Sequence, residues 1–294
     1  FKILKIINKD KNKNKIFFSM QYFCNVWSIL FIKLFCNVKT FIYEINHLNE
    51  LKNYQNNIDK FKKNLILFLV KRLYKYSDIV STNSAECSKD LSNLINRKVI
   101  TIYNPCFEKL TLKKNKYKKQ TKIRILNIAR LSYQKDQITI LKAINSTKIK
   151  NYVKLTLVGF GPLKKDLSNF IKINKLNAKI ISNKKKLNTY YKNNDLFLYT
   201  SLYEGLPTTV VEAASFSMPI VSSNFKSGSE EILCSGRGGY TFDIRDYKKL
   251  SNIIYKFYFN PKPFYKKEKY CRKNLYKFSK YINLKKFNSV LEKI

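Results

Sequence analysis

Short apolar runs alternate with longer segments of helical periodicity along this chain, and the alternation starts twice. Such alternation implies right-handed crossovers between parallel strands, because each helix must pack back onto the sheet that its strands form. Expected strands are residues 15–19, 40–44, 78–82 and 99–103 in the first half, and 123–128, 153–158, 178–182, 196–200 and 219–222 in the second. Expected helices are 20–32, 60–76, 85–95, 138–144, 163–173 and 208–216, followed by a helical tail from 247 to 294. The sequence therefore predicts an α/β protein with two parallel-sheet domains.

A charged stretch with few apolar residues separates the two series of elements. It follows Asn104 and Pro105, which end the last strand of the first series. We expect a first domain at 1–112, a linker at 113–122, a second domain at 123–280, and a terminal helix at 281–294 that crosses back to the first domain. The chain starts at Phe1 inside an amphipathic pattern, so we expect the first domain to lack its beginning.

The formal charge of +39 arises from 58 Lys and Arg against 19 Asp and Glu. The excess is mostly lysine interleaved with asparagine and isoleucine, without the clustered arginine or stacking motifs of a nucleic-acid-binding module. We therefore expect compositional drift and a general affinity for anionic partners, including anionic membrane surfaces, and no specific nucleic acid.

The six cysteines form no C-x-x-C pair, and His47 is the only histidine. We expect no metal site and no cofactor, and reduced thiols in a cytoplasmic protein. The most apolar stretch, 20–32, is about 13 residues long, whereas a helix needs about 20 to span a bilayer. A buried helix is the expected structure for it.

Ligands of parallel sheets bind at the loops that follow the carboxyl ends of strands, so chemistry is expected there. In the loop after 123–128, Arg130 offers a planar fork for phosphate oxygens and Lys135 a mobile charge, although two solvated cations would look the same. In the loop after 153–158, Gly159 and Gly161 permit a close approach of backbone amides to a nucleotide, or simply make a tight turn.

The segment 204–212, EGLPTTVVE, contains the strongest local signal. Gly205 and Pro207 predict a sharp turn after the strand 196–200, and the helix that begins near Thr208 directs its amino end to the same edge of the sheet. An anionic ligand is expected there. The carboxylates of Glu204 and Glu212 flank the turn, and a pair of solvated glutamates or the two carboxylates of a glycoside hydrolase remain alternatives.

Four ordered motifs resemble the family 4 retaining glycosyltransferases. The segment 204–212 is similar to the family's signature of two glutamates with seven residues between them, including the G-L-P after the first. The segment 129–136, ARLSYQKD, resembles the phosphate-binding G-R-L…Q-K element, and 158–163, VGFGPL, resembles the V-G-x-G-P-L turn. The segment 227–233, SGSEEIL, resembles the S-G-P-x-E-I-L element, with Ser229 in place of proline.

The resemblance implies a GT-B fold, with two Rossmann-like domains of which the first is incomplete. It also implies transfer of a sugar from a nucleotide-diphosphate sugar to a glycan or lipid-linked acceptor, with retention of configuration and without an obligatory metal. Arg130 and Lys135 would stabilise the leaving diphosphate, and Glu204 would orient the donor sugar. Donor binding would fall to the two glycines of the turn and to the signature segment, namely Gly159, Gly161, Gly205, Leu206, Pro207, Thr208 and Glu212.

The segment 43–51, YEINHLNEL, is similar to the family's loop S-E-R-N-x-L-S-E-L. Asn46 and His47 are therefore candidates for a substrate-facing loop, with a capping or exposed histidine as the alternative. The family setting is cell-envelope polysaccharide or lipid-linked glycan assembly, which places the protein in the cytoplasm at the inner face of the plasma membrane. A sugar-nucleotide epimerase, a phosphorylase of the same architecture, and a basic nucleic-acid-binding protein stay open.

Overall fold

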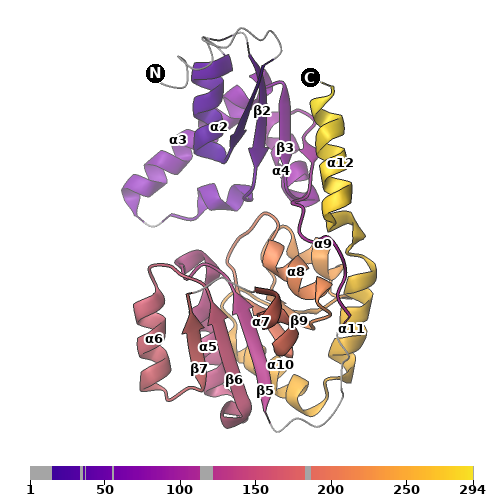
Figure 1. Ribbon diagram of the computed structural model, residues 1–294. Helices are drawn as coiled ribbons and strands as arrows, with labels where there is room; N and C mark the ends of the chain where they lie inside the picture. Colours follow the sequence, from indigo (N-terminus) through magenta and orange to yellow (C-terminus); the bar gives the residue numbers. More distant parts are fainter. Residues whose placement is uncertain are drawn as a thin grey trace. The chain divides into compact units, whose positions relative to one another are not determined.

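The computed structural model describes residues 15–33, 36, 38–54, 56–112, 122–182 and 187–293 (Figure 1). The chain divides into two compact units. Unit 1 extends to Asn104 and adds Tyr203–Leu206 and the end of the chain from Asn283, and unit 2 comprises Pro105–Leu202 and Pro207–Ile282. The predicted linker 113–122 lies outside the described residues except for Lys122, and residues 105–112 group with unit 2.

Unit 1 is built on a parallel sheet of four strands in the order β1-β2-β3-β4. Its strands are β1 (Ile16–Met20), β2 (Lys39–Glu44), β3 (Ile79–Thr82) and β4 (Ile100–Thr101). Its helices are α2 (Tyr22–Ser28), which continues as the π-helix η1 (Ile29–Lys33), α3 (Asn57–Leu73), α4 (Ala85–Ile95) and the short 3-10 turns η2 (Leu48–Lys52) and η3 (Tyr74–Tyr76). The expected helix 20–32 is thus divided between two helix types, and the expected strand 99–103 is only two residues long.

Alternate residues of β2 face the two sides of the unit 1 sheet. Ile42 packs into the core that α2, α3 and α4 contribute, whereas Phe41 and Tyr43 pack on the other side. There they meet the last helix, α12 (Lys280–Leu291), through Phe287 and Val290. The part of α12 from Asn283 onward therefore belongs to unit 1, because its apolar side chains complete that core.

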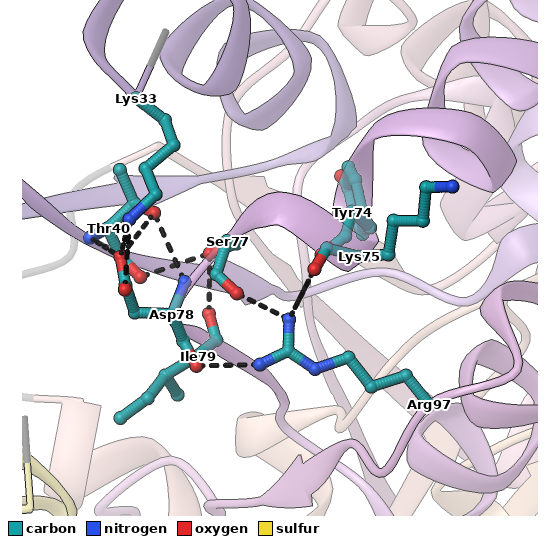
Figure 2. Close-up of polar contacts among 8 residues, drawn as sticks. All are labelled: Lys33, Thr40, Tyr74, Lys75, Ser77, Asp78, Ile79 and Arg97. Atoms are coloured by element: carbon teal, nitrogen blue, oxygen red, sulfur yellow. Dashed lines mark hydrogen bonds and ion pairs between the residues drawn. The ribbon is translucent and has the colours of Figure 1, made fainter.

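A polar cluster fastens the amino ends of β2 and β3 in unit 1 (Figure 2). The Lys33 ammonium contacts the Asp78 carboxylate at 2.8 Å, and the Thr40 amide donates to the same carboxylate at 2.7 Å. Burial alone would raise the pKa of Asp78, but these hydrogen bonds outweigh it and hold the pKa below its usual range. Arg97 donates to backbone carbonyls at the end of η3, including that of Lys75 at 3.1 Å, and so supplies partners for carbonyls at the end of that turn.

Unit 2 contains a parallel sheet of six strands in the order β10-β9-β8-β5-β6-β7. Its strands are β5 (Ile123–Ile128), β6 (Val153–Val158), β7 (Ala178–Ile181), β8 (Leu196–Tyr199), β9 (Ile220–Ser223) and β10 (Tyr240–Phe242). Its helices are α5 (Gln137–Ser146), α6 (Lys164–Ile173), α7 (Leu187–Asn193), α8 (Thr208–Ser215), α9 (Ser229–Leu233), α10 (Tyr247–Phe259) and α11 (Lys262–Lys273). Three 3-10 turns complete it: η4 (Tyr133–Lys135), η5 (Lys150–Tyr152) and η6 (Tyr276–Phe278).

The central strands of unit 2 read as nearly continuous apolar runs because both faces of the sheet are covered. All four residues of β8 are buried, and β5 exposes only Arg124. The Arg124 guanidinium contacts the Asp195 carboxylate at 2.7 Å, which joins β5 to the start of β8 at the amino edge of the sheet. Loops follow the strands at the opposite edge of the sheet, where the strands have their carboxyl ends.

The α/β class with two parallel sheets is confirmed, and the structure adds elements that the sequence pattern did not predict. These are α7, α9 and β10, each of which has seven residues or fewer. Such short segments contain too little periodicity to distinguish them from loops. The amphipathic pattern at the start of the chain, residues 1–7, lies outside the described residues.

Candidate functional site

In the unit 2 sheet, the strands that follow β5 are added on one side of it, and the strands that follow β8 are added on the opposite side. The connections that leave these two neighbouring strands pass to opposite faces of the sheet, because the chain continues from β5 to β6 on one side and from β8 to β9 on the other. A crevice at the carboxyl ends of such strands is where open α/β sheets bind ligands. The loops after β5 and β8 therefore define the candidate site of unit 2.

Arg130 lies in the loop after β5 with its side chain exposed. Its carbonyl accepts a hydrogen bond from the Gln137 side chain at 2.9 Å, while the next residue, Leu131, is fully buried. The Leu131 amide donates to the Phe160 carbonyl at 2.8 Å, so the loops after β5 and β6 hold each other. The backbone at Arg130 is fixed by these contacts, and its guanidinium is free to meet an anion from solvent.

Lys135 is half-buried at the end of the same loop and contacts β8. Its ammonium donates to the Tyr199 hydroxyl at 3.2 Å and lies 5.8 Å from the centre of that ring. Its carbonyl accepts from the Thr200 hydroxyl at 2.9 Å, just beyond the end of β8. The structure thus places Lys135 at the switch point, in the 3-10 turn η4 that precedes α5.

Gly159 and Gly161 lie where the loop after β6 crosses the loop after β5. A Cβ at Gly159 would overlap the carbonyl oxygen of Ala129, and one at Gly161 would overlap that of Leu131. Glycine is required at both positions because backbone occupies the space of a side chain. The two glycines therefore fix the spacing of the two loops, which is a structural reason for residues that were expected to bind the donor.

Helix α8 begins at Thr208, directly after Pro207, and its amino end belongs to the same edge of the sheet. The first amides of a helix have no partners within it and attract negative charge. One turn into α8, half-buried Glu212 accepts a hydrogen bond from the Tyr191 hydroxyl of α7 at 2.7 Å. Burial raises the pKa of Glu212, and the bond from Tyr191 opposes that rise.

Tyr191 is a site residue that the sequence did not reveal. It is buried, and its ring stacks on Phe216 with centroids 5.2 Å apart, so its hydroxyl is held against Glu212. No motif contains it, and its helix was not predicted. Only the tertiary structure shows that Glu212 has a fixed orientation.

The first half of the signature segment belongs to unit 1. Gly205 is buried against the backbone of Ile45 and the side chain of Asn83, and a Cβ there would overlap both. Leu206 and Glu204 are also buried. Burial raises the pKa of Glu50, a hydrogen bond from Asn46 and the charge of Lys63 oppose that rise, and the charge of Glu204 adds a smaller increase. The side chains of Asn46, Glu50 and Glu204 thus form a polar cluster in unit 1.

His47 caps η2. Its Nδ1 accepts from the Asn49 amide at 3.1 Å, and its Nε2 lies 2.9 Å from the Asp90 carboxylate. Since Nδ1 accepts, Nε2 bears the proton and donates to Asp90. Both ring nitrogens are engaged inside unit 1 and the side chain is buried, which favours the capping alternative over a substrate-facing histidine.

Glu44, at the carboxyl end of β2, is a second group that the sequence did not single out as a site. It accepts hydrogen bonds from the Asn25 side chain at 2.7 Å and from the Tyr74 hydroxyl. Burial raises the pKa of Glu44 to about 8, although both hydrogen bonds act to lower it. At neutral pH this side chain is mostly an uncharged acid inside unit 1.

Among the described residues, no three His, Cys, Asp or Glu side chains gather closely enough to hold a metal ion. Within that same part of the chain, no helix combines the length and apolar character needed to cross a bilayer.

Residues 108–278 match the family model described as glycosyl transferases group 1. An uncharacterized glycosyltransferase of Methanocaldococcus jannaschii is 32% identical over 200 residues, covering 61% of this chain and 48% of the relative. The N-acetylgalactosamine-N,N'-diacetylbacillosaminyl-diphospho-undecaprenol 4-alpha-N-acetylgalactosaminyltransferase of Campylobacter jejuni is 24% identical, covering 71% of this chain and 55% of the relative. The chain therefore spans about half the length of these curated relatives.

A solved structure of Anabaena HepE in complex with UDP-glucose superposes with a TM-score of 0.80. It is 16% identical and covers 99% of this chain and 82% of that protein, which shows a shared fold.

Proposed function

Because this chain belongs to the group 1 glycosyl transferases, we propose that it transfers a sugar from a nucleotide-diphosphate sugar to an acceptor hydroxyl with retention of anomeric configuration. The observation that carries the proposal is the carboxyl edge of the unit 2 sheet. There Arg130, Lys135 and the amino end of α8 occur on the loops of the two strands at the switch point.

The reaction breaks the bond between the anomeric carbon and a diphosphate oxygen, so negative charge grows on the leaving diphosphate. Arg130 supplies a planar, exposed guanidinium and Lys135 an ammonium that Tyr199 already orients. Cations and helix dipoles that are placed in advance stabilise such charge without reorganisation, and this term is usually the largest in catalysis. No metal ion enters this proposal.

Glu212 would bind the nucleoside by accepting hydrogen bonds from ribose hydroxyls. One of its oxygens receives the Tyr191 hydroxyl, which fixes the plane of the carboxylate. Gly159 and Gly161 would let the nucleotide approach the backbone of the loop after β6. The unprotonated form of Glu212 is the acceptor, so the opposing effect of Tyr191 on its pKa assists binding.

The signature segment supplies the remaining proposed contacts. By its match to the family motif, Glu204 would orient the donor sugar and balance the cationic character of the anomeric carbon. Backbone groups of Gly205, Leu206, Pro207 and Thr208 would hold the sugar and the phosphate. We keep Asn46 among the candidates for substrate contact, whereas His47 serves to position its loop.

The donor and acceptor are proposed from what similar proteins are named for. A neighbour in fold binds UDP-glucose, so we propose a UDP-sugar as donor. A relative acts on a glycan attached to diphospho-undecaprenol, so we propose a lipid-linked or cell-envelope glycan acceptor. Such an acceptor would place the protein at the inner face of the plasma membrane.

Thermal unfolding with UDP, UDP-glucose, UDP-N-acetylglucosamine and guanosine or adenosine diphosphates tests the proposal. A ligand at about one hundred times its Kd should stabilise the protein by about 2.7 kcal/mol, and Arg130→Ala should abolish that shift. Absence of any shift with every nucleotide would contradict the proposal. Turnover of a UDP-sugar without an acceptor, or only with free phosphate, would favour the epimerase or phosphorylase instead.

A further inference from the structure

The outer side of α3 in unit 1 is apolar, although the helix already buries another side. Ile66 and Val70 pack into the unit 1 core. The large apolar side chains on the opposite side recur at intervals of three and four residues, which puts them in one stripe along the helix. They are between 47% and 71% exposed and comprise Ile58, Phe61, Leu65 and Phe68.

The neighbouring helix α2 and its π-helical continuation contain a second stripe of this kind. Phe23, Trp27 and Phe31 follow one another at intervals of four residues and are between 43% and 55% exposed. The rings of Trp27 and Phe31 stack with centroids 5.2 Å apart. Helix α2 packs against α3, and we call these three residues and the four of α3 together the α2/α3 face.

Positive charge borders the α2/α3 face. Lys60, Lys62 and Arg72 are exposed on α3, and the Arg72 guanidinium lies 5.5 Å from the centre of the Phe68 ring. Asp59 is the only acidic residue of α3, and it pairs with Lys63 at 2.9 Å. α2 and its continuation contain no acidic residue. The face therefore combines aromatic and aliphatic side chains with a net positive border.

We propose that the α2/α3 face binds the surface of an anionic lipid bilayer. Tryptophan, phenylalanine and leucine flanked by lysine are the side chains that insert at the boundary between headgroups and acyl chains, while the lysines meet lipid phosphates. Large apolar side chains that stay exposed to water in such numbers favour association with an apolar partner. The inference rests on the proposed function for its setting, since a lipid-linked acceptor lies at a bilayer.

Trp27 is the only tryptophan of the sequence, so its fluorescence reports on this face alone. Vesicles that contain phosphatidylglycerol should shift its emission to the blue, and lipids brominated on the acyl chains should quench it. Pure phosphatidylcholine vesicles should give a weaker signal, and high salt should weaken the response to phosphatidylglycerol. An unchanged Trp27 spectrum in protein that sediments with the vesicles would overturn the proposal, because contact would then lie elsewhere.

Two double variants separate this face from apolar exposure in general. Phe61→Ser with Phe68→Ser keeps Trp27 and should lower vesicle affinity by roughly tenfold or more. The matched control, Ile173→Ser with Phe259→Ser, changes unit 2 side chains that are 78% and 60% exposed and should leave affinity unchanged. Circular dichroism checks that each variant folds. An equal loss in both variants would overturn the proposal.

Two further measurements keep this inference separate from the proposed function. Acrylamide should quench Trp27 readily in the free protein, and shielding of Trp27 would overturn the proposal by showing that protein already covers the face. Nucleotide-induced stabilisation is measured without vesicles. Nucleotide binding without a vesicle response overturns the inference alone, and a vesicle response without nucleotide binding supports the inference while contradicting the proposed function.

Discussion

The carboxyl edges of the two sheets differ in the exposure and hydrogen bonding of their charged and polar side chains. In unit 2, Arg130 is exposed to solvent and Lys135 is held at the end of β8. In unit 1, Glu44 and His47 are buried and are engaged by neighbouring groups of the same unit. The same parallel architecture therefore offers cations to an incoming anion in one unit, and fixes its own loops in the other.

The difference shows how a side chain can be assigned to binding or to architecture. Arg130 has its backbone fixed and its charge in solvent, which suits a group that receives a ligand. His47 has both nitrogens engaged, which suits a group that holds a turn. Four predictions examine this distinction.

The largest expected effect is that of Arg130→Ala on sugar transfer. If the unit 2 edge stabilises the leaving diphosphate, kcat should fall about 10²–10³-fold, as when a single charge-stabilising donor is removed from an active site. Arg130→Lys should recover part of the loss, because it keeps the charge and loses the fork. Steady-state kinetics measures both variants.

Lys165→Ala is the control, because it removes an exposed cation of α6. It should leave kcat and the free energy of unfolding unchanged. A comparable loss of kcat in this variant would indicate a general effect of charge and would remove the contrast between the two edges.

Glu44 should make the stability of unit 1 depend on pH. Its pKa is about 8 in the folded protein and near 4.5 when exposed, so the folded state keeps the proton over a range where the unfolded state releases it. The contribution of protonated Glu44 to the free energy of unfolding is complete below pH 4.5 and is lost as pH rises through 8. The full loss should be about 5 kcal/mol, and Glu44→Gln should remove this pH dependence.

Trp27 fluorescence during denaturant unfolding measures unit 1 selectively, because no other tryptophan exists. Asp90→Asn is a suitable comparison, since it changes an acid of unit 1 that pairs with His47 without removing Glu44. If the free energy of unfolding depends on pH equally in wild-type and Glu44→Gln protein, Glu44 is ionised when folded. That outcome would contradict the proposal that Glu44 is a buried, uncharged acid.

Gly159→Ala should destabilise the unit 2 edge by about 2 to 3 kcal/mol, because the new Cβ meets the Ala129 backbone and the two loops must separate. Hydrogen exchange of β5 and β6 amides measures the loss locally. Gly236→Ala is the control. It meets no atom within 4 Å, and its φ of +82° should cost only about 1 kcal/mol. A smaller loss at Gly159 than at Gly236 would refute the packing argument.

The smallest expected effect is that of Tyr191→Phe. The variant keeps the ring stack on Phe216 and removes only the hydrogen bond to Glu212, so UDP affinity should fall about fivefold, or about 1 kcal/mol. Titration calorimetry measures the Kd. Tyr190→Phe, on the same helix, should leave it unchanged, and an equal fall there would mean that Tyr191 does not act through Glu212.

Much of the architecture could be read from the chain because its strongest signals are local. The runs at 123–128 and 153–158 became β5 and β6 with the predicted bounds, since buried parallel strands need continuous apolar residues. The roles of the site residues remain predictions. The structure nevertheless brings Lys135 to β8, and the hydrogen bonds of His47 favour the capping alternative that the sequence had left open.

The sequence by itself determined the alternation of strands and helices, the excess of lysine, and the motifs on the loops, because these depend on neighbours along the chain. Only the tertiary structure decided that Tyr191 orients Glu212, that Glu44 is a buried acid, and that α3 has a second apolar side facing outward. These properties depend on burial and on partners more than ten residues away. Periodicity shows that a helix has apolar residues, but packing alone shows which of them the core uses.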